Sequence, residues 1–198
     1  MSPQIFIFIG RSGCGKGTQA ALLSNYLKEV SPERSVFYLQ IGEEFREFIK
    51  GDTYTQKLAK KIHDAGGLVP EFLAVYFWSR RLAQEYRGLE HLVIDGTPRK
   101  FHEAGVLHSI FDFYKFSSAY VVYLNVSKEW AVEKLKSRGR VDDNEQDIEA
   151  RLAWFETDVL PAVEFYRKNS FYRFVEVNGE QSVEAVWKDV RKGVGFNE

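Results

Sequence analysis

The sequence predicts an α/β fold, with a parallel sheet of about five strands between layers of helices. Two observations lead to this prediction. Short apolar runs such as residues 5–9 lack the polar–apolar alternation of a sheet with one wet face, so both faces of these strands are expected to be buried. These runs also alternate with longer amphipathic segments, which is the order of elements in parallel sheets whose strands are joined by helices.

Each expected strand is a short apolar run. In chain order, the strands are expected at Gln4–Ile9, Val36–Gln40, Leu92–Asp95, Ala119–Asn125 and Phe171–Val177. The expected helices are the longer segments, at Thr18–Val30, Glu43–Ala65, Pro70–Tyr86, Phe101–Phe111, Glu129–Ser137, Glu145–Lys168 and Ser182–Lys192. The second of these helices is expected to break near Gly51. In the sixth, apolar residues recur at helical spacing from Ile148 to Val163, and Pro161 is expected to kink the helix.

Length and composition fit one soluble domain. The chain has 198 residues, of which 44% are hydrophobic and 28% charged, so a single domain with its own core is expected. Its net charge of −1 argues against a broad nucleic-acid-binding face. The longest apolar run, residues 72–78, is far shorter than the roughly 20 residues that cross a bilayer, and residues 1–9 do not resemble a signal peptide. Cys14 is the only cysteine, which excludes an internal disulfide and suits a reducing compartment, so we expect a cytoplasmic protein that binds neither membrane nor nucleic acid.

A glycine-rich loop directly follows the first expected strand. It reads Gly-Arg-Ser-Gly-Cys-Gly-Lys from Gly10 to Lys16, which matches the spacing of the Walker A phosphate-binding pattern. Glycines let backbone N–H groups turn toward phosphate oxygens, and the next helix adds its positive N-terminal end, while Lys16 is expected to reach the outer phosphates. Gly17 stands where the general pattern has serine or threonine, and Thr18 follows it. The direct hydroxyl ligand to Mg²⁺ is therefore missing from its usual position.

Four further motifs follow in order along the chain. They are Ile41-Gly42 with Arg46, Gly67-Leu68-Val69-Pro70, Asp95-Gly96-Thr97-Pro98-Arg99, and Arg138-Gly139-Arg140 with Asp142, Asp143 and Arg151. Together with the sequence from Gly15 to Gln19, these motifs resemble the adenylate kinase family of nucleoside monophosphate kinases over nearly the whole chain. The resemblance implies a three-layer α/β/α P-loop kinase fold, with a helical acceptor-binding insert at about residues 41–70 and a short lid at about residues 137–144.

The resemblance also implies the residues of two nucleotide sites. The expected ATP-binding residues are Gly13, Cys14, Gly15, Lys16, Gly17, Thr18, Lys134, Arg138 and Gln181. The expected acceptor-binding residues are Ile41, Gly42, Arg46, Gly67, Leu68, Val69, Gly96, Arg99, Glu103, Arg140 and Arg151. The expected catalytic residues are Lys16, Arg99, Arg138, Arg140 and Arg151. Phosphoryl transfer mostly requires positioning and neutralisation of negative charge, and guanidinium groups stay charged and grip phosphate oxygens with two donors.

Asp95 is the candidate metal-binding residue. It ends an apolar strand, and in an open parallel sheet the carboxyl ends of the strands face the ligand crevice. Because Mg²⁺ keeps much of its hydration shell, Asp95 is expected to hold the ion of Mg²⁺-ATP through water. A turn-capping role is the alternative for this carboxylate. No zinc is expected, because the lid segment contains no cysteine.

Four positions depart from the family's pattern near the nucleotide bases. Lys134 stands where an arginine usually lies against the donor base, so a planar stacking surface is lost. Ile41 and Thr97 replace a threonine and an aromatic residue, and Glu103 replaces the glutamine that reads adenine. A carboxylate only accepts hydrogen bonds, so an ionised Glu103 would suit the two donors of guanine better than adenine.

The position of Glu103 relative to Arg99 adds to this hypothesis. The two residues are four apart, so a helix starting at Arg99 would place both on one face, the phosphate grip beside the base reader. The alternative is a solvent-exposed glutamate at the start of a helix, with no contact to the base.

The sequence therefore predicts an enzyme that transfers a phosphoryl group from Mg²⁺-ATP to a nucleoside monophosphate. AMP is the leading acceptor, with two ADP as products, and a preference for GMP or a broad acceptor range is the main alternative. A non-catalytic nucleotide-binding module and a P-loop kinase for a small metabolite are weaker alternatives, because the arginines and the acceptor motifs argue against them. The enzyme is expected to act as a monomer.

Overall fold

Five parallel strands form the centre of the structure, a computed structural model that describes residues 2–138 and 145–196. The strands are β1 (Ile5–Gly10), β2 (Val36–Leu39), β3 (His91–Asp95), β4 (Ala119–Asn125) and β5 (Tyr172–Asn178). They pair in the order β2-β3-β1-β4-β5, and every pair is parallel. The predicted sheet is therefore confirmed, with each strand boundary within one residue of its expected place.

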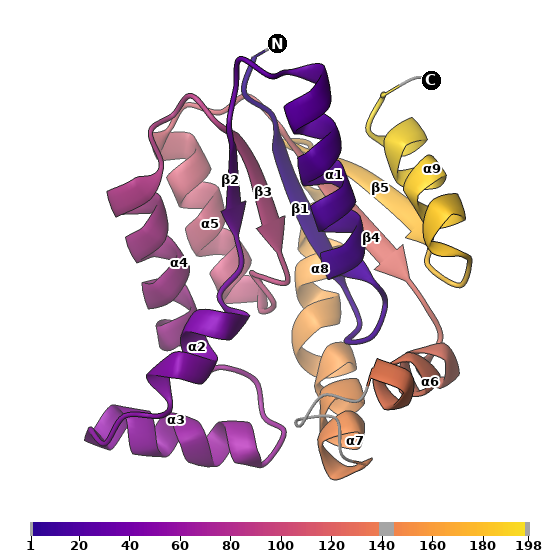
Figure 1. Cartoon of the computed structure of the whole chain (residues 1–198). Helices are drawn as coiled ribbons and strands as arrows, with labels where there is room; N and C mark the ends of the chain where they lie inside the picture. Colours follow the sequence, from indigo (N-terminus) through magenta and orange to yellow (C-terminus); the bar gives the residue numbers. More distant parts are fainter. Residues whose placement is uncertain (1, 139–144, 197–198) are drawn as a thin grey trace.

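Helices cover both faces of this sheet (Figure 1). On one face lie α1 (Lys16–Val30) and α9 (Val183–Gly193). On the other face lie α4 (Glu71–Glu85), α5 (Phe101–Phe113) and α8 (Leu160–Lys168). The three-layer α/β/α arrangement is thus confirmed. In the described part of the chain, none of the helices has the length and apolar character needed to span a membrane.

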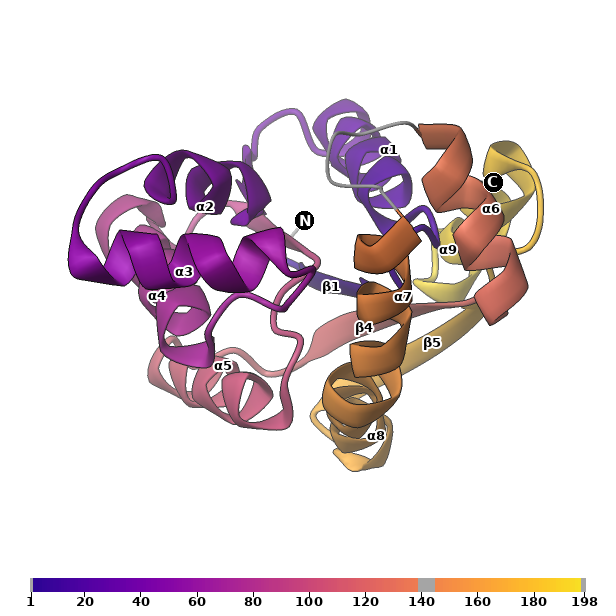
Figure 2. The same cartoon turned by 90° about the horizontal axis from the view of Figure 1, so that it is seen from below.

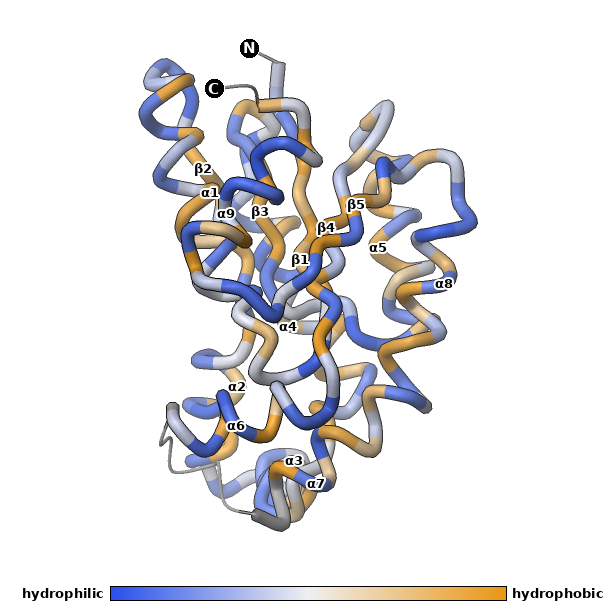
Figure 3. Tube along the Cα trace, turned by 90° about the vertical axis from the view of Figure 1, so that its right-hand side faces the viewer, coloured by the Kyte–Doolittle hydropathy of each residue, from blue (hydrophilic) through white to orange (hydrophobic). Residues whose placement is uncertain are grey.

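The central strand β1 shows why the apolar runs are continuous. Ile5, Ile7 and Ile9 pack into a core with α4, α5 and α8, whereas Phe6 and Phe8 pack into a second core with α1 and α9. Successive side chains of a strand point to opposite faces, so a strand covered on both faces must be apolar at every position. Figure 3 shows the apolar residues of these strands between helices of mixed hydropathy.

The remaining helices lie beyond the carboxyl ends of the strands. They are α2 (Gly42–Phe48), α3 (Tyr54–Asp64), α6 (Lys128–Arg138) and α7 (Glu145–Trp154). Seen from below in Figure 2, α2 and α3 lie on one side of the molecule and α6 and α7 on the other. The predicted break near Gly51 is confirmed, because α2 ends at Phe48 and Thr53 caps the start of α3 by accepting a hydrogen bond from the Gln56 N–H.

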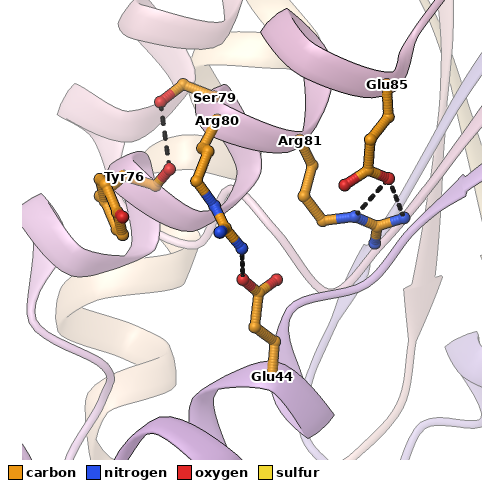
Figure 4. Close-up of polar contacts among 6 residues, drawn as sticks. All are labelled: Glu44, Tyr76, Ser79, Arg80, Arg81 and Glu85. Atoms are coloured by element: carbon orange, nitrogen blue, oxygen red, sulfur yellow. Dashed lines mark hydrogen bonds and ion pairs between the residues drawn. The ribbon is translucent and has the colours of Figure 1, made fainter.

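An ion pair orients α2 on α4 (Figure 4). Arg80 of α4 pairs with Glu44 of α2, while the next arginine, Arg81, pairs with Glu85 within α4. Such half-exposed pairs contribute little stability, so the effect of the Arg80 contact is mainly on orientation. Because α2 carries Arg46, this contact helps to set where that predicted acceptor-binding residue lies.

The long helix predicted over residues 145–168 is interrupted. A π-helical turn at Phe155–Val159 separates α7 from α8. Pro161 lies in the first turn of α8, where its missing N–H and its ring prevent a regular hydrogen bond to the carbonyl four residues earlier. The disturbance expected at Pro161 therefore takes the form of a wider π turn that precedes the proline.

Candidate functional site

A cavity of about 870 Å³ opens at the carboxyl ends of the strands. Its wall includes every predicted site residue whose side chain the structure describes. Of the predicted ATP-binding residues these are Gly13, Cys14, Gly15, Lys16, Gly17, Thr18, Lys134 and Gln181, together with the predicted metal-binding residue Asp95. Of the predicted acceptor-binding residues they are Ile41, Gly42, Arg46, Gly67, Leu68, Val69, Gly96, Arg99, Glu103 and Arg151. Arg138 ends α6 with its side chain outside the described part, and Arg140 and most of the predicted lid also lie outside the described residues.

The glycine-rich loop after β1 shapes one end of this cavity. Gly13 and Gly15 have φ angles of 87° and 89°, in the left-handed region that glycine adopts freely. A Cβ on Gly13 would lie 2.8 Å from the carbonyl oxygen of Ala131, so no larger residue fits there. Within the described residues, the N-terminus of α1 has neither a side-chain cap nor an acidic residue in its first turn. The first N–H groups of α1 are therefore left for an anion in the cavity.

Lys16 points back into this loop. Its Nζ donates hydrogen bonds to the carbonyl oxygens of Gly10 at 3.3 Å and Arg11 at 3.1 Å. These neutral acceptors bind a cation more weakly than an ionised phosphate does, because charge-assisted hydrogen bonds are the stronger ones. The amine is thus held at the loop and can turn toward phosphate oxygens.

Asp95 ends β3 beside the start of α1. Its Oδ2 accepts hydrogen bonds from the Tyr38 hydroxyl at 3.0 Å and from Gln40 Nε2 at 3.2 Å. Burial, with a further contribution from this carboxylate, raises the pKa of Tyr38, so the phenol keeps its proton and donates. A Cβ on Gly17 would come 3.2 Å from the same Oδ2. A serine or threonine at position 17 would therefore crowd the carboxylate, which gives a physical reason for the glycine.

Arginines from three separate segments converge on the cavity. Arg46 comes from α2, Arg99 from the loop after β3, and Arg151 from α7. Arg99 is held by a hydrogen bond from its Nε to the carbonyl oxygen of Gly96 at 2.8 Å. Burial lowers the pKa of Arg99, and the charge of Arg151 acts in the same direction. Cations that face one cavity, one of them partly dehydrated, suit a polyanionic ligand.

Glu103 lies beside Arg99, as predicted. The prediction that a shared helix face brings the two residues together is wrong. The helix α5 begins at Phe101, so Arg99 lies in the loop before it and the two residues do not share a helix face. Instead, Glu103 Oε2 accepts a hydrogen bond from the backbone N–H of Arg99 at 2.8 Å. The side chain is 2% exposed, which also excludes a solvent-exposed glutamate. Burial raises the pKa of Glu103, against hydrogen bonds from the N–H groups of Arg99 and Lys100 that lower it.

Two tryptophans on the cavity wall were not among the predicted site residues. Trp130 lies four residues before Lys134 on α6, and the Lys134 Nζ is 4.4 Å from the centre of its ring. Trp154 lies three residues after Arg151 on α7. These spacings place each tryptophan on the same helix face as a predicted site residue, and that was the available signal. Trp130 supplies an aromatic plane next to Lys134, the predicted ATP-binding residue that lacks one.

The loop between β5 and α9 closes the same end of the cavity. Gln181 Nε2 donates to the Asn178 carbonyl oxygen and to Asp189 Oδ2, both at 2.9 Å. Gln19 Nε2, on α1, donates to the Val183 carbonyl oxygen at 3.0 Å. This loop is therefore tied to the helix that begins at the phosphate loop.

Comparisons with known proteins agree with this arrangement. The sequence model of the family described as adenylate kinase matches residues 8–171. An adenylate kinase of Prochlorococcus marinus is 33% identical over 174 residues, which are 88% of this chain and 90% of the relative. Adenylate kinase 1 of a Nostoc species is 31% identical over 189 residues, 96% of this chain and 97% of the relative. An adenylate kinase of Corynebacterium urealyticum is 32% identical over 180 residues, 91% and 93% of the two chains. With its phosphate loop, its converging arginines and these matches, the chain belongs to the adenylate kinase family.

Proposed function

We propose that the chain transfers the terminal phosphoryl group of Mg²⁺-ATP to AMP and so produces two ADP. The observation that carries this proposal is the convergence of Lys16 with Arg46, Arg99 and Arg151 on one cavity. Phosphoryl transfer depends mainly on positioning and on neutralising the charge of the transferred group. Cations from four separate segments can do both, and the adenylate kinase relatives support AMP as the acceptor.

The two nucleotides would occupy opposite ends of the cavity. ATP would place its phosphates on the loop from Gly13 to Thr18 and its base near Lys134 and Gln181. AMP would place its phosphate between Arg46 and Arg99, with its base near the remaining acceptor-side residues, which are Ile41, Gly42, Gly67, Leu68, Val69, Gly96 and Glu103. Arg151, together with Arg138 and Arg140, would neutralise the phosphoryl group in transfer.

The residues near the phosphate loop fit a magnesium ion that is held mainly by water and phosphate. Asp95 supplies one carboxylate beside the start of α1, and Tyr38 and Gln40 keep it oriented. The described residues contain no cluster of three metal-ligating side chains, so a bound Mg²⁺ would keep most of its water ligands. When bound, the ion would neutralise part of the charge of the donor phosphates. Asp95 would accept hydrogen bonds from the water around it.

Glu103 is the observation that favours a second acceptor, GMP. Its buried carboxylate lies on the acceptor wall, and in the ionised form it offers only acceptors to a base. An acceptor screen with ATP and each common nucleoside monophosphate, followed by coupled detection of ADP, separates the possibilities. We expect AMP to give the highest kcat/KM. A higher value for GMP would move the assignment to a guanylate-preferring enzyme, and no ADP with any acceptor would leave only a nucleotide-binding module.

We further propose that the insert at residues 41–70 and the lid at residues 137–144 close over the two nucleotides. The predicted phosphate-binding arginines come from separate segments and have to converge with water excluded. An analogue that joins two adenosines through phosphates should reduce the radius of gyration measured by small-angle scattering. Identical scattering with and without a saturating amount of the analogue would contradict closure.

The remaining proposals concern the state and place of the enzyme. The described residues predicted for both nucleotide sites lie in one chain and line one cavity, which supports an active monomer. The single cysteine, Cys14, supports a reducing compartment such as the cytoplasm. Sedimentation of the active enzyme tests the first of these proposals, because a dimer at assay concentration would contradict it.

A further inference from the structure

Trp154, the last residue of α7, contacts two parts of the acceptor side that lie far away in the sequence. Its Nε1–H donates a hydrogen bond to the carbonyl oxygen of Gly66 at 3.2 Å. Its ring also lies under Arg99, whose guanidinium carbon is 5.5 Å from the ring centre. That separation is within the range of a cation–π contact. One side chain thus joins α7 to the acceptor loop and to a predicted phosphate-binding arginine.

Gly66 is the point at which the acceptor loop starts. It lies two residues after the end of α3 with a φ of 70°, and its N–H donates to the His63 carbonyl oxygen at 2.9 Å. The predicted acceptor residues Gly67 to Val69 follow directly. A bond that holds the Gly66 carbonyl therefore fixes where this loop leaves the helix, and with it the position of the loop against α7.

The two residues after Trp154 hold the phosphate loop. Phe155 lies under the guanidinium of Arg11, whose central carbon is 4.1 Å from the ring centre. Glu156 Oε1 pairs with Arg11 Nη2 at 2.5 Å. Arg11 is the second residue of the phosphate loop, and its Nε also donates to the Val126 carbonyl oxygen at 3.2 Å. Residues 154–156 therefore contact both the ATP side and the acceptor side of the cavity.

We infer that Trp154 is a positioning residue that sets Arg99 and the acceptor loop at a fixed place relative to the phosphate loop. The inference rests on the proposed function for the identity of the acceptor, a nucleoside monophosphate. The indole ring presents its negative face to the guanidinium, and its N–H holds the loop, so no aliphatic side chain of similar volume can do both. Loss of Trp154 should weaken the acceptor complex and leave ATP binding intact.

Three variants test this inference by kinetics. Trp154→Leu removes both contacts, whereas Trp154→Phe keeps a ring under Arg99 and removes only the hydrogen bond. Trp187→Phe is the matched control, because Trp187 is a half-buried tryptophan on α9 that packs against Tyr26, with ring centres 5.8 Å apart. For Trp154→Leu we expect the KM for AMP to rise about tenfold, and for Trp154→Phe about threefold. The KM for ATP should stay within about twofold in all three variants, since none of them changes the donor side.

The split between the two KM values distinguishes positioning from simple packing. A residue that only stabilises the fold would lower the urea midpoint without separating the two KM values, as we expect for Trp187→Phe. An equal rise in both KM values, or no change in either, would overturn the inference. If Trp154→Leu fails to unfold cooperatively, Trp154→Phe decides the outcome.

A binding measurement keeps the inference testable if the wild-type protein forms no ADP. AMP alone is titrated into the wild type, Trp154→Phe and Trp187→Phe, and tryptophan emission is recorded. The ligand phosphate should change the surroundings of Trp154 through Arg99, so the emission change should occur in the wild type and Trp187→Phe and be lost in Trp154→Phe. An identical change in Trp154→Phe, or no change in the wild type at saturating AMP, would contradict the inference. If only the proposed function is wrong, the wild type will form no ADP, but this pattern of emission changes will still be observed.

Discussion

Replacing Glu103 with glutamine tests the acceptor base and the start of α5 together. Glutamine keeps an oxygen that can accept from the Arg99 N–H, a contact of 2.8 Å in the structure, but it removes the titrating charge. Burial raises the pKa of Glu103 in the folded protein. The folded state therefore binds a proton at this position more readily than the unfolded chain does.

The sign of the stability effect follows from this raised pKa. The wild type loses stability as the pH rises from the ordinary glutamate value, 4.5, through the higher value of the folded state. Glu103→Gln does not titrate and escapes this loss. We expect the variant to exceed the wild type in urea midpoint at about pH 7 and to lose that advantage near pH 4. A difference that does not change with pH would refute the direction assigned to this pKa.

The expected change in base preference follows from hydrogen-bond chemistry. An ionised Glu103 would accept from two donors of guanine but would face a lone pair on the ring of adenine. The side chain is 2% exposed, so water cannot relieve a poor contact. A repelled polar group in a closed pocket costs about 1–3 kcal/mol, which is about 5- to 150-fold in the ratio of kcat/KM values. Glu103→Gln should therefore shift that ratio toward AMP, most strongly at high pH.

The assay compares kcat/KM for AMP and GMP over a range of pH in the wild type, in Glu103→Gln and in a control. Glu85→Gln is a suitable control, because Glu85 is an exposed residue at the end of α4 that pairs with Arg81. An AMP-to-GMP ratio that stays unchanged in Glu103→Gln at every pH would show that Glu103 holds the backbone N–H of Arg99 and does not read the base.

Three further predictions use the same structure. Lys16→Met should lower kcat by at least about 100-fold and leave the circular dichroism spectrum unchanged. A loss of kcat of less than about threefold, roughly 0.7 kcal/mol, would contradict a role of Lys16 in charge neutralisation. Trp130→Ala should raise the KM for ATP about fivefold and leave the KM for AMP unchanged, because the variant loses the aromatic plane beside Lys134, where ATP is proposed to bind. Equal effects on both KM values would contradict the placement of Trp130 beside ATP. Burial lowers the pKa of His91, whose Nδ1 accepts from the Gln4 N–H at 3.2 Å, so the wild type should lose stability as the pH falls below 6.5, the ordinary histidine value. His91→Asn keeps an acceptor but does not titrate, and equal pH slopes of the urea midpoints in both proteins would argue against this account.

The sheet was predictable because its signal is local. Each strand is an apolar run with helices on both sides, so the run itself marks both its place and its burial. The form of the break before Pro161 was not predictable, because proline excludes a regular turn without specifying a π turn in its place.

The gathering of residues at one cavity was predictable where short motifs carry them. The phosphate loop and the three described arginines are named by their motifs, and the cavity wall includes all of them. Contacts between distant segments were not predictable in this way. The bond from Trp154 to Gly66 joins residues 88 positions apart. The bond from the Arg99 N–H to Glu103 depends on α5 beginning at Phe101, which leaves Arg99 in the loop before the helix.

The close approach of Gly17 to Asp95 couples the side chains that fit at these two positions. An added Cβ at position 17 would lie 3.2 Å from Asp95 Oδ2, closer than most such contacts, so the Asp95 carboxylate would have to move by a few tenths of an ångström. Restoring the hydroxyl of the general phosphate-loop pattern by itself would therefore strain the carboxylate that β3 already presents. A library that varies positions 17 and 95 in combination should recover active pairs that single-site scanning at either position discards.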